Sequence, residues 1–235
     1  MCMFSILSVF FGFFLTSSGF FRSSLRPRAA KLSMVLCPIK GGSVVALVTP
    51  MTTTNAVDYE KLIELLEWHI SQGTDGAVIL GTTGEASTLS LEERTQVIKT
   101  SVSTVKGAFP IIVGTGTIDT QKTIELSKNA KEHGADGILV ITPYYVKPPQ
   151  RALITHFNAV ADAVQLPTIV YNCPGRTGVT MTPETVGACS KNPYIIGLKD
   201  AMGTLVDRIA PIRSLSKPDF LLYRLSMFCK KNFRP

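Results

Sequence analysis

No Asp or Glu occurs before Asp58 in this 235-residue sequence, although five Lys and Arg residues do. Four more basic residues and no acid lie in residues 224–235. The formal net charge of +7 therefore belongs to the ends of the chain, because residues 58–223 contain slightly more acidic than basic side chains. A nucleic-acid-binding domain carries its basic residues as a patch on the folded part. We therefore predict no nucleic-acid partner.

Cysteine is scarce, and its spacing excludes two classes of small-protein scaffold. The sequence has no CxxC pair and no histidine at metal-ligand spacing from a cysteine. A chain of this length with few, irregularly placed cysteines does not indicate a disulfide framework. We predict free thiols and no metal site. The five cysteines are Cys2, Cys37, Cys173, Cys189 and Cys229.

The N-terminal apolar run Phe4–Leu15 is shorter than the roughly 20 residues that a membrane-spanning helix needs. Small residues, Thr16–Gly19, follow it, and the acid-free, Arg- and Ser-bearing segment Phe20–Lys31 comes next. A signal peptide followed by a transit segment resembles the two-part presequences of plastids reached through the secretory route. We predict that residues 1–40 are such a presequence, with no stable membrane association after processing. A signal anchor in the endomembrane system is the alternative, because Met1–Phe21 carries no charge.

Short runs of apolar and β-branched residues alternate with longer amphipathic stretches from Gly42 onward. The runs predict strands at Ser43–Val48, Gly76–Leu80, Pro110–Val113, Gly137–Ile141, Thr168–Tyr171, Tyr194–Leu198 and Phe220–Tyr223. The stretches predict helices at Tyr59–Gln72, Leu91–Lys106, Thr120–His133, Arg151–Val164, Pro183–Ser190 and Leu205–Leu215. Such alternation predicts a parallel sheet covered by helices.

Several helix ends carry local signals. Ser90 and Glu93 have the spacing of a capping box, and Thr182-Pro183 places proline in the first helical turn. Three helices are followed by glycines that would accept a left-handed conformation: Gly73, Gly107 and Gly134.

We predict an α/β fold, a (β/α)8 TIM barrel that is incomplete. Strands 1–7 lie within residues 41–223, and strand 8 and the C-terminal helices are missing. Residues 224–235 are basic and aperiodic, and we interpret them as a divergent tail. A doubly wound open sheet is the competing fold, but no GxGxxG follows the first strand.

In a barrel the active residues stand at the carboxyl ends of strands, where the following loops converge. Lys199 ends the sixth predicted strand, so apolar neighbours would desolvate its amine. A desolvated lysine has a lowered pKa and can attack a carbonyl group as the free amine. The alternative is a strand-end lysine whose amine reaches solvent.

Three other polar motifs follow neighbouring strands. Tyr171 ends the fifth, and a phenol beside an imine-forming lysine can transfer protons. Thr82 and Thr83 lie between two glycines, where free backbone N–H groups could bind a carboxylate; ordinary turn formation is the alternative. Arg176 provides a planar cation suited to a second carboxylate, unless it is a surface loop arginine.

Together these motifs resemble the dihydrodipicolinate synthase family, within the superfamily of pyruvate-dependent class I aldolases and lyases. The resemblance covers about Gly42 to Tyr223. It implies that Lys199 forms a Schiff base with pyruvate and that Tyr171, Thr82 and Tyr145 form a proton relay. In the family, the residue matched by Tyr145 is lent across a subunit interface, so the resemblance also implies a homo-oligomer, a dimer or tetramer.

The same resemblance implies that Thr83 holds the pyruvate carboxylate and that Arg176 holds the carboxylate of aspartate 4-semialdehyde. The product would be 4-hydroxy-tetrahydrodipicolinate, in diaminopimelate and lysine biosynthesis, with no cofactor beyond the lysine imine. Sialic acid lyases share the lysine and tyrosine but lack an arginine in this loop. Family members inhibited by lysine place Asn and Glu where this chain has Ile118 and Lys122, which argues against feedback inhibition.

Two other functions stay open at this point. One is an aldolase of the same superfamily that acts on oxo-sugar acids. The other is a non-catalytic barrel fragment that becomes stable only when a partner completes it, because an open barrel leaves two strand edges unpaired.

Overall fold

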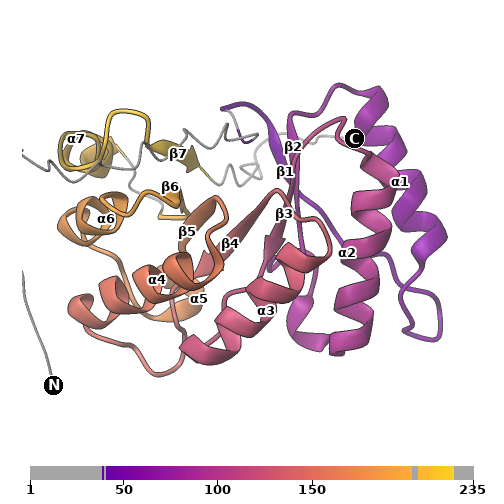
Figure 1. Cartoon of the computed structure of the whole chain (residues 1–235), viewed down its shortest axis with the longest axis horizontal. Helices are drawn as coiled ribbons and strands as arrows, with labels where there is room; N and C mark the ends of the chain where they lie inside the picture. Colours follow the sequence, from indigo (N-terminus) through magenta and orange to yellow (C-terminus); the bar gives the residue numbers. More distant parts are fainter. Residues whose placement is uncertain (1–38, 40, 203–205, 225–235) are drawn as a thin grey trace, which may run out of the picture. The chain divides into compact units, whose positions relative to one another are not determined.

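A computed structural model describes residues 39, 41–202 and 206–224 of the chain (Figure 1). The strands are β1 Val44–Ala46, β2 Gly76–Ile79, β3 Ile111–Gly114, β4 Gly137–Ile141, β5 Thr168–Asn172, β6 Ile195–Asp200 and β7 Leu221–Arg224. The helices are α1 Tyr59–Ser71, α2 Leu91–Val105, α3 Thr120–Glu132, α4 Gln150–Val164, α5 Pro174–Thr177, α6 Pro183–Ser190 and α7 Val206–Leu215. A short 3₁₀ helix, η1, covers Ala86–Thr88.

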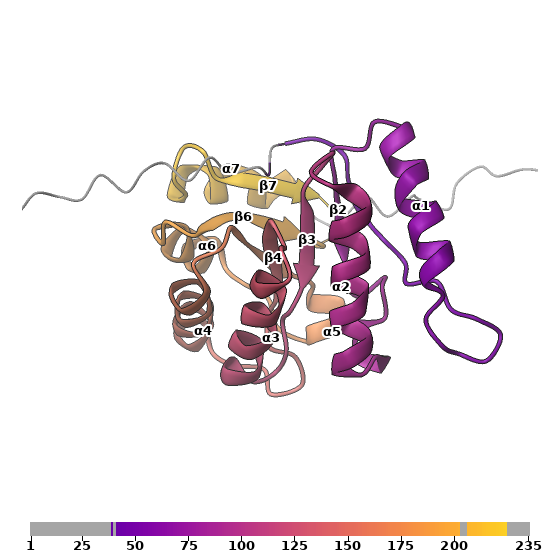
Figure 2. The ribbon, with the colours of Figure 1, turned by 45° about the vertical axis from the view of Figure 1, so that its right-hand side comes forward.

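All strand pairs are parallel, and each strand pairs with its neighbours in sequence, from β1 through to β7. A doubly wound sheet would reverse its strand order at a switch point, so this order excludes the competing fold. The sheet curls into most of a barrel, with helices on its outer side (Figure 2). The prediction of an incomplete (β/α)8 barrel is thus confirmed. Within the described residues, β1 and β7 are edge strands.

Two layers of side chains fill the space on the two faces of the sheet. The larger layer lies between the sheet and the helices, and includes Val140, Val170 and Leu198 from the strands and Phe157 from α4. The smaller layer lies on the inner face, and Tyr171 belongs to it. Successive strand residues point to opposite faces, so neighbouring residues of one strand contribute to different layers.

The helix signals in the sequence are confirmed. Ser90 Oγ accepts from Glu93 N at 3.1 Å, and the Glu93 carboxylate accepts from Ser90 N at 2.8 Å. Thr182 caps α6, which begins at Pro183. Each glycine predicted to follow a helix has a positive φ: Gly73, Gly107 and Gly134.

Two short helices were not expected, because η1 and α5 are too brief to show a helical period. Strand β7 reaches Arg224, so the chain leaves the sheet one residue later than predicted. The predicted presequence, apart from Ile39, and the tail beyond residue 224 lie outside the described residues. Plastid targeting therefore stays a prediction.

Strand β6 contains an irregularity where it pairs with β5. Thr168 pairs with Ile195, whereas the next residue, Ile169, pairs with Gly197. One residue of β6, Ile196, is therefore extra, as in a β-bulge. Ile195 packs in the outer layer, while Ile196 packs against the inner one. Beyond the bulge the pairs are regular, and Tyr171 pairs with Lys199.

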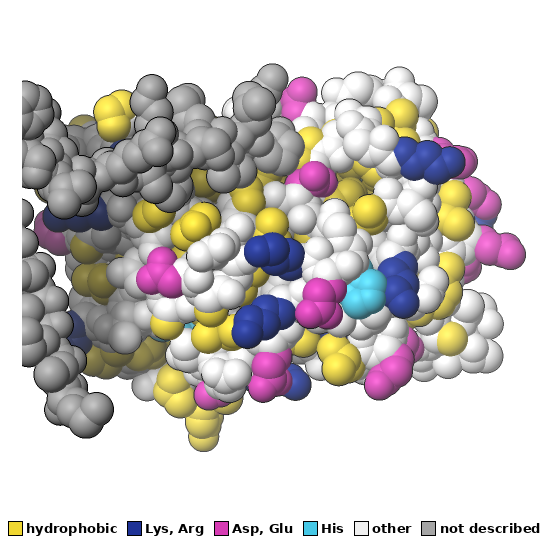
Figure 3. Space-filling view, viewed as in Figure 1, with side chains coloured by type: hydrophobic (Ala, Val, Ile, Leu, Met, Phe, Trp, Pro, Cys, Tyr) yellow, Lys and Arg dark blue, Asp and Glu magenta, His cyan; other side chains and the backbone are white. Residues whose placement is uncertain are grey.

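Acidic and basic side chains are interspersed on the face seen in Figure 3. Lys61 and Glu64, and Lys122 and Glu125, form exposed ion pairs, each between residues three apart on one helix. No helix in the described ranges is long and apolar enough to cross a membrane.

Candidate active site

A row of side chains crosses the inner face near the carboxyl ends of four neighbouring strands. Ile141 pairs with Tyr171, Tyr171 with Lys199, and Lys199 with Tyr223. The register of the sheet alone therefore brings Lys199 and Tyr171 together from strands that are far apart in sequence. This is the juxtaposition that the sequence predicted.

The Lys199 amine lies over the aromatic ring of Tyr171, with Nζ 4.7 Å from the ring centroid. Burial lowers the pKa of the Lys199 amine from its ordinary value, and the nearby Cys173 thiol opposes this shift. The first cause is the larger because a buried ammonium group loses hydration that a few neighbours do not restore. A larger fraction of this lysine is therefore unprotonated near neutral pH than of a lysine in water.

Tyr171 is buried on the inner face beside Cys173. Burial is the main cause that raises the pKa of the Tyr171 phenol, and contact with Cys173 adds to it. The nearby Thr82 side chain and the charge of Arg176 act in the opposite direction. The phenol is consequently protonated at neutral pH and can donate a proton. Cys173 and Cys189 are free and buried, in agreement with the prediction for those two thiols.

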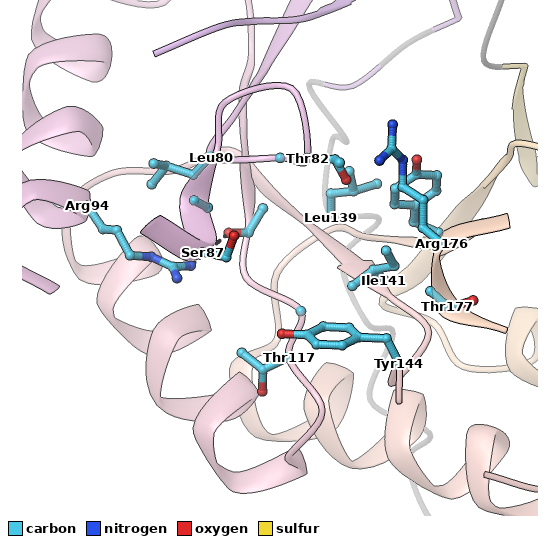
Figure 4. Close-up of a pocket in the computed structure, with 15 residues that line it drawn as sticks. Leu80, Thr82, Ser87, Arg94, Thr117, Leu139, Ile141, Tyr144, Arg176 and Thr177 are labelled. Atoms are coloured by element: carbon cyan, nitrogen blue, oxygen red, sulfur yellow. Dashed lines mark hydrogen bonds between the residues drawn. The ribbon is translucent and has the colours of Figure 1, made fainter. Parts of the chain in front are cut away.

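A cavity of about 280 Å³ opens beside this row (Figure 4). Thr82, from the turn after β2, lines it together with Tyr171 of β5 and Arg176 of α5. Lys199 lines a different and larger cavity of about 970 Å³, next to residues of β1 and β7. The lysine and the tyrosine are in contact, but they face different spaces.

The turn that contains Thr82 and Thr83 leaves backbone donors available. Gly84 N donates to Gly81 O at 3.1 Å, and Glu85 N donates to Thr82 O at 3.3 Å. The N–H groups of Thr82 and Thr83 make no hydrogen bond to any residue that the structure describes. They have the chemistry expected of a carboxylate site. Thr83 itself is exposed and is absent from the cavity lining.

Close backbone packing holds this turn over the third strand. A Cβ atom at Gly114 would stand 2.1 Å from Leu80 O, so only glycine fits there. Leu80 adopts a left-handed conformation, with φ of 53°. Thr49 Oγ1 also donates to Gly84 O at 2.7 Å. The turn is therefore held against β3 and against the segment that follows β1.

Tyr145 is the one proposed relay residue that the described part of the chain does not bring to the others. It is 87% exposed, has φ of 66°, and lines neither cavity. Its exposure is compatible with a side chain that acts in a neighbouring subunit. The role predicted for it stays a prediction.

A buried polar network, which sequence reasoning missed, lies directly behind the lysine and the tyrosine. Asn172 Nδ2 donates to Asp200 Oδ1 at 2.9 Å, and Asn172 Oδ1 accepts from Met181 N at 3.0 Å. Arg208 Nε pairs with Asp200 Oδ2 at 3.3 Å, and Arg208 Nη2 donates to Met181 O at 2.7 Å. Asn172 and Asp200 follow Tyr171 and Lys199 in sequence. The network thus fixes the ends of β5 and β6 against each other.

The chain matches one known protein family over most of its length. The model of the dihydrodipicolinate synthetase family matches residues 40–224. The chain belongs to this family. Relatives in it include the 4-hydroxy-tetrahydrodipicolinate synthases of Alcanivorax borkumensis, 50% identical over 182 residues, and Geobacter metallireducens, 53% identical over 164 residues. These alignments cover 77% and 70% of this chain.

Solved structures of the dihydrodipicolinate synthetase family share the fold. The enzyme of Acinetobacter baumannii, described as chloride-inhibited and complexed with pyruvate, has 49% identity and a TM-score of 0.76. The enzyme of Cyanidioschyzon merolae, with lysine bound, has 40% identity and a TM-score of 0.76. Both cover 78% of this chain, which in turn covers 62% and 63% of those chains.

The chain spans 62% of the length of the Alcanivorax relative and 56% of the Geobacter relative. No group of three or more His, Cys, Asp or Glu in the described ranges is placed to hold a metal ion.

Proposed function

We propose that this chain condenses pyruvate with aspartate 4-semialdehyde to give 4-hydroxy-tetrahydrodipicolinate, through a Schiff base on Lys199. The observation that carries the proposal is the desolvated Lys199 amine in contact with the Tyr171 ring. The names of the bacterial relatives, and the pyruvate in the Acinetobacter structure, support the same reaction.

The first step is attack of the unprotonated Lys199 amine on the ketone carbon of pyruvate. The carbonyl oxygen takes up protons and leaves as water, and the lysine imine forms. Loss of a proton from the pyruvate methyl group gives an enamine, whose carbon attacks the aldehyde. The amino group of the semialdehyde then displaces Lys199 as the ring closes. One water is released overall, and no oxidant or cofactor is consumed.

The protonated Tyr171 phenol, whose ring the lysine amine contacts, would donate and then take back protons during these steps. Thr82, whose side chain lies near the phenol, would pass protons on to Tyr145 of a neighbouring subunit in a homo-oligomer. The free N–H groups of the Thr82–Thr83 turn would bind the pyruvate carboxylate. Arg176, at the cavity beside Tyr171, would bind the carboxylate of the semialdehyde.

Borohydride trapping of the imine tests the lysine directly. The full chain is incubated with pyruvate and borohydride, and the modified residue is mapped by mass spectrometry. We expect one adduct, on Lys199, and none in a Lys199→Ala variant. Lys99→Ala is the matched control, because Lys99 is exposed on α2 and should leave the adduct unchanged. An adduct on another lysine, or none in the unaltered chain, contradicts the proposal.

Arg176→Ala tests the assignment of the second substrate. Loss of a charged hydrogen bond to the semialdehyde should lower kcat/KM for that substrate by roughly thirty- to several-hundred-fold, which corresponds to about 2–4 kcal/mol. Imine formation with pyruvate alone should change little. An equal loss in both assays would mean that the arginine has only a structural role.

A further inference from the structure

Lys199 stands between two tyrosines on the inner face of the sheet. It pairs with Tyr171 of β5 on one side and with Tyr223 of β7 on the other. Neighbouring strands lie about 4.8 Å apart, and residues paired across them point to the same face. Tyr223 accordingly packs against the inner layer to which Tyr171 belongs. The proposed condensation uses only the first of these two tyrosines.

The two tyrosines line different cavities. Tyr171 lines the smaller one, whereas Tyr223 lines the larger one together with Lys199. Strands β6 and β7 lie side by side (Figure 2), so Lys199 and Tyr223 reach this larger cavity from neighbouring strands. Thr82 and Arg176 line the smaller cavity and are absent from the lining of the larger one. A carbonyl compound in the larger cavity would therefore meet an amine and a phenol, but neither group proposed to hold a substrate carboxylate.

The larger cavity has a mainly apolar lining. The two edge strands contribute Val44, Val45 and Ala46 from β1 and Leu221 and Leu222 from β7. Among the described residues of the lining, the Asp, Glu, Lys and Arg side chains are those of Lys199, Arg213 and Asp219. Apart from the reactive amine, one cation and one anion balance each other. The cavity thus suits an apolar substituent and has no excess charge that would select a carboxylate.

The volume of this cavity admits a substrate much larger than pyruvate. It measures about 970 Å³, against about 280 Å³ for the smaller cavity. Protein sites that enclose drug-sized molecules measure about 300–1,000 Å³. An aldehyde on a bicyclic aromatic ring is within that range. Lys199 is half-buried, so its amine is partly desolvated and can still be reached.

We propose that Lys199 and Tyr223 form a second carbonyl site, in which bulky apolar aldehydes without a carboxylate become imines of Lys199. The inference rests on the same reactive amine as the proposed condensation. The amine attacks the aldehyde carbon, and the Tyr223 phenol gives its proton to the carbonyl oxygen and takes one from the nitrogen. The phenol then protonates the resulting hydroxyl group, which leaves as water, and takes back the proton of the iminium nitrogen. Aldehyde and amine give imine and water, and the phenol is regenerated.

Reductive trapping of the full chain with 2-naphthaldehyde and cyanoborohydride tests this site. Cyanoborohydride gives hydride to the imine carbon, and mass spectrometry of the digested chain measures the adduct on each lysine. Lys99, which is exposed on α2, is the internal reference. We expect at least tenfold more adduct on Lys199 than on Lys99. With acetaldehyde, which has the same reactive group and no aromatic ring, this ratio should fall at least fivefold.

Matched variants separate the two tyrosines. Tyr223→Phe should slow the trapping of naphthaldehyde at least fivefold and slow the trapping of pyruvate less. Tyr171→Phe should show the opposite order. Ala46→Phe, which narrows the larger cavity from β1, should also slow naphthaldehyde more than pyruvate. It supplies a second readout if Tyr223→Phe does not fold.

The two substrates distinguish failure of this inference from failure of the proposed condensation. A pyruvate adduct on Lys199 without a naphthaldehyde adduct overturns the second site and leaves the condensation standing. A naphthaldehyde adduct without a pyruvate adduct supports the second site and contradicts the condensation. The second site is also overturned if Lys199 and Lys99 carry equal amounts of naphthaldehyde, or if Tyr223→Phe and Ala46→Phe both leave its trapping rate unchanged.

Discussion

The centre and the edges of the sheet differ in how completely their side chains are enclosed. Every residue of β5 is buried, whereas the three residues of β1 are only half-buried. Tyr171 stands in this enclosed centre, while Lys199 stands on β6, beside the edge strand β7. The proposed proton donor is therefore held rigidly, and the nucleophilic amine faces the larger cavity at the open side. The Tyr171 phenol is thus enclosed, while the Lys199 amine lines a cavity that a substrate could enter.

The largest expected loss of stability comes from breaking the buried network of Asn172, Asp200 and Arg208, which lies between the centre of the sheet and its β7 edge. Asp200→Asn keeps the shape of the side chain but leaves Arg208 without its carboxylate. Removal of one partner of a buried ion pair costs about 3–5 kcal/mol, and the two side chains here are only 5% and 14% exposed. Chemical denaturation measures the loss in free energy of unfolding.

Glu64→Gln is the matched control for that variant. It breaks the Lys61–Glu64 pair, in which both side chains are 61% exposed, and it should cost less than about 1 kcal/mol. Similar losses in the two variants would mean that Asp200 contributes as little as a surface carboxylate.

This network could not be predicted from the sequence, although the fold around it could. The apolar runs and helix caps sufficed to predict the strand order, since they depend on local residues. Nothing local marks Asn172 and Asp200 as partners, because their contact depends on the exact register of two strands. Arg208 joins them from α7, another element again. The one signal in the sequence is that a polar residue directly follows each of Tyr171 and Lys199, at the ends of two strands that were predicted to be neighbours.

Equal substitutions at the centre and at the edge should differ in cost. Val170→Ala removes two methyl groups from a side chain that is 0% exposed, and it should cost about 2–3 kcal/mol. Val45→Ala, on β1, should cost about 1 kcal/mol or less, because that residue is half-buried. Thermal or denaturant unfolding measures both, and equal costs would contradict the comparison.

Two histidines extend the comparison to pH. His156 Nδ1 on α4 and His69 Nδ1 on α1 each lie 2.9 Å from a threonine hydroxyl, of Thr120 and Thr74 respectively. Burial lowers the pKa of His156 to about 4, while the pKa of His69 is lowered less. The unfolded chain protonates the His156 imidazole near the ordinary pKa of 6.5, whereas the folded chain does so only near pH 4. Protonation therefore favours the unfolded chain. The free energy of unfolding is highest above about pH 6.5 and decreases as the pH falls toward 4.

The expected loss from His156 between pH 7 and pH 5 is about 2 kcal/mol. His156→Gln should flatten the pH dependence of the free energy of unfolding over that range. His69→Gln should change it much less, because His69 is half-buried. The same slope in both variants would show that burial at α4 is not the cause.

The site residues were predictable to different degrees for a physical reason. Lys199, Tyr171 and Thr82 stand within three residues of strand ends, and parallel strands bring such positions together whatever their side chains are. The role predicted for Tyr145 involves a second copy of the chain, so a single chain does not test it.

The bulge at Ile196 determines which single-residue deletions the site can survive. Ile195 packs in the outer layer, so regular alternation from that residue would turn Lys199 toward the helices and away from Tyr171. The extra residue restores the inward direction of the lysine. Deletion of Ile196 should therefore regularise β6 and keep Lys199 paired with Tyr171. Deletion of Leu198, two positions later, should also keep Lys199 paired with Tyr171, but it puts Gly197 in the place of a fully buried leucine of the outer layer. It should therefore cost more free energy of unfolding than deletion of Ile196.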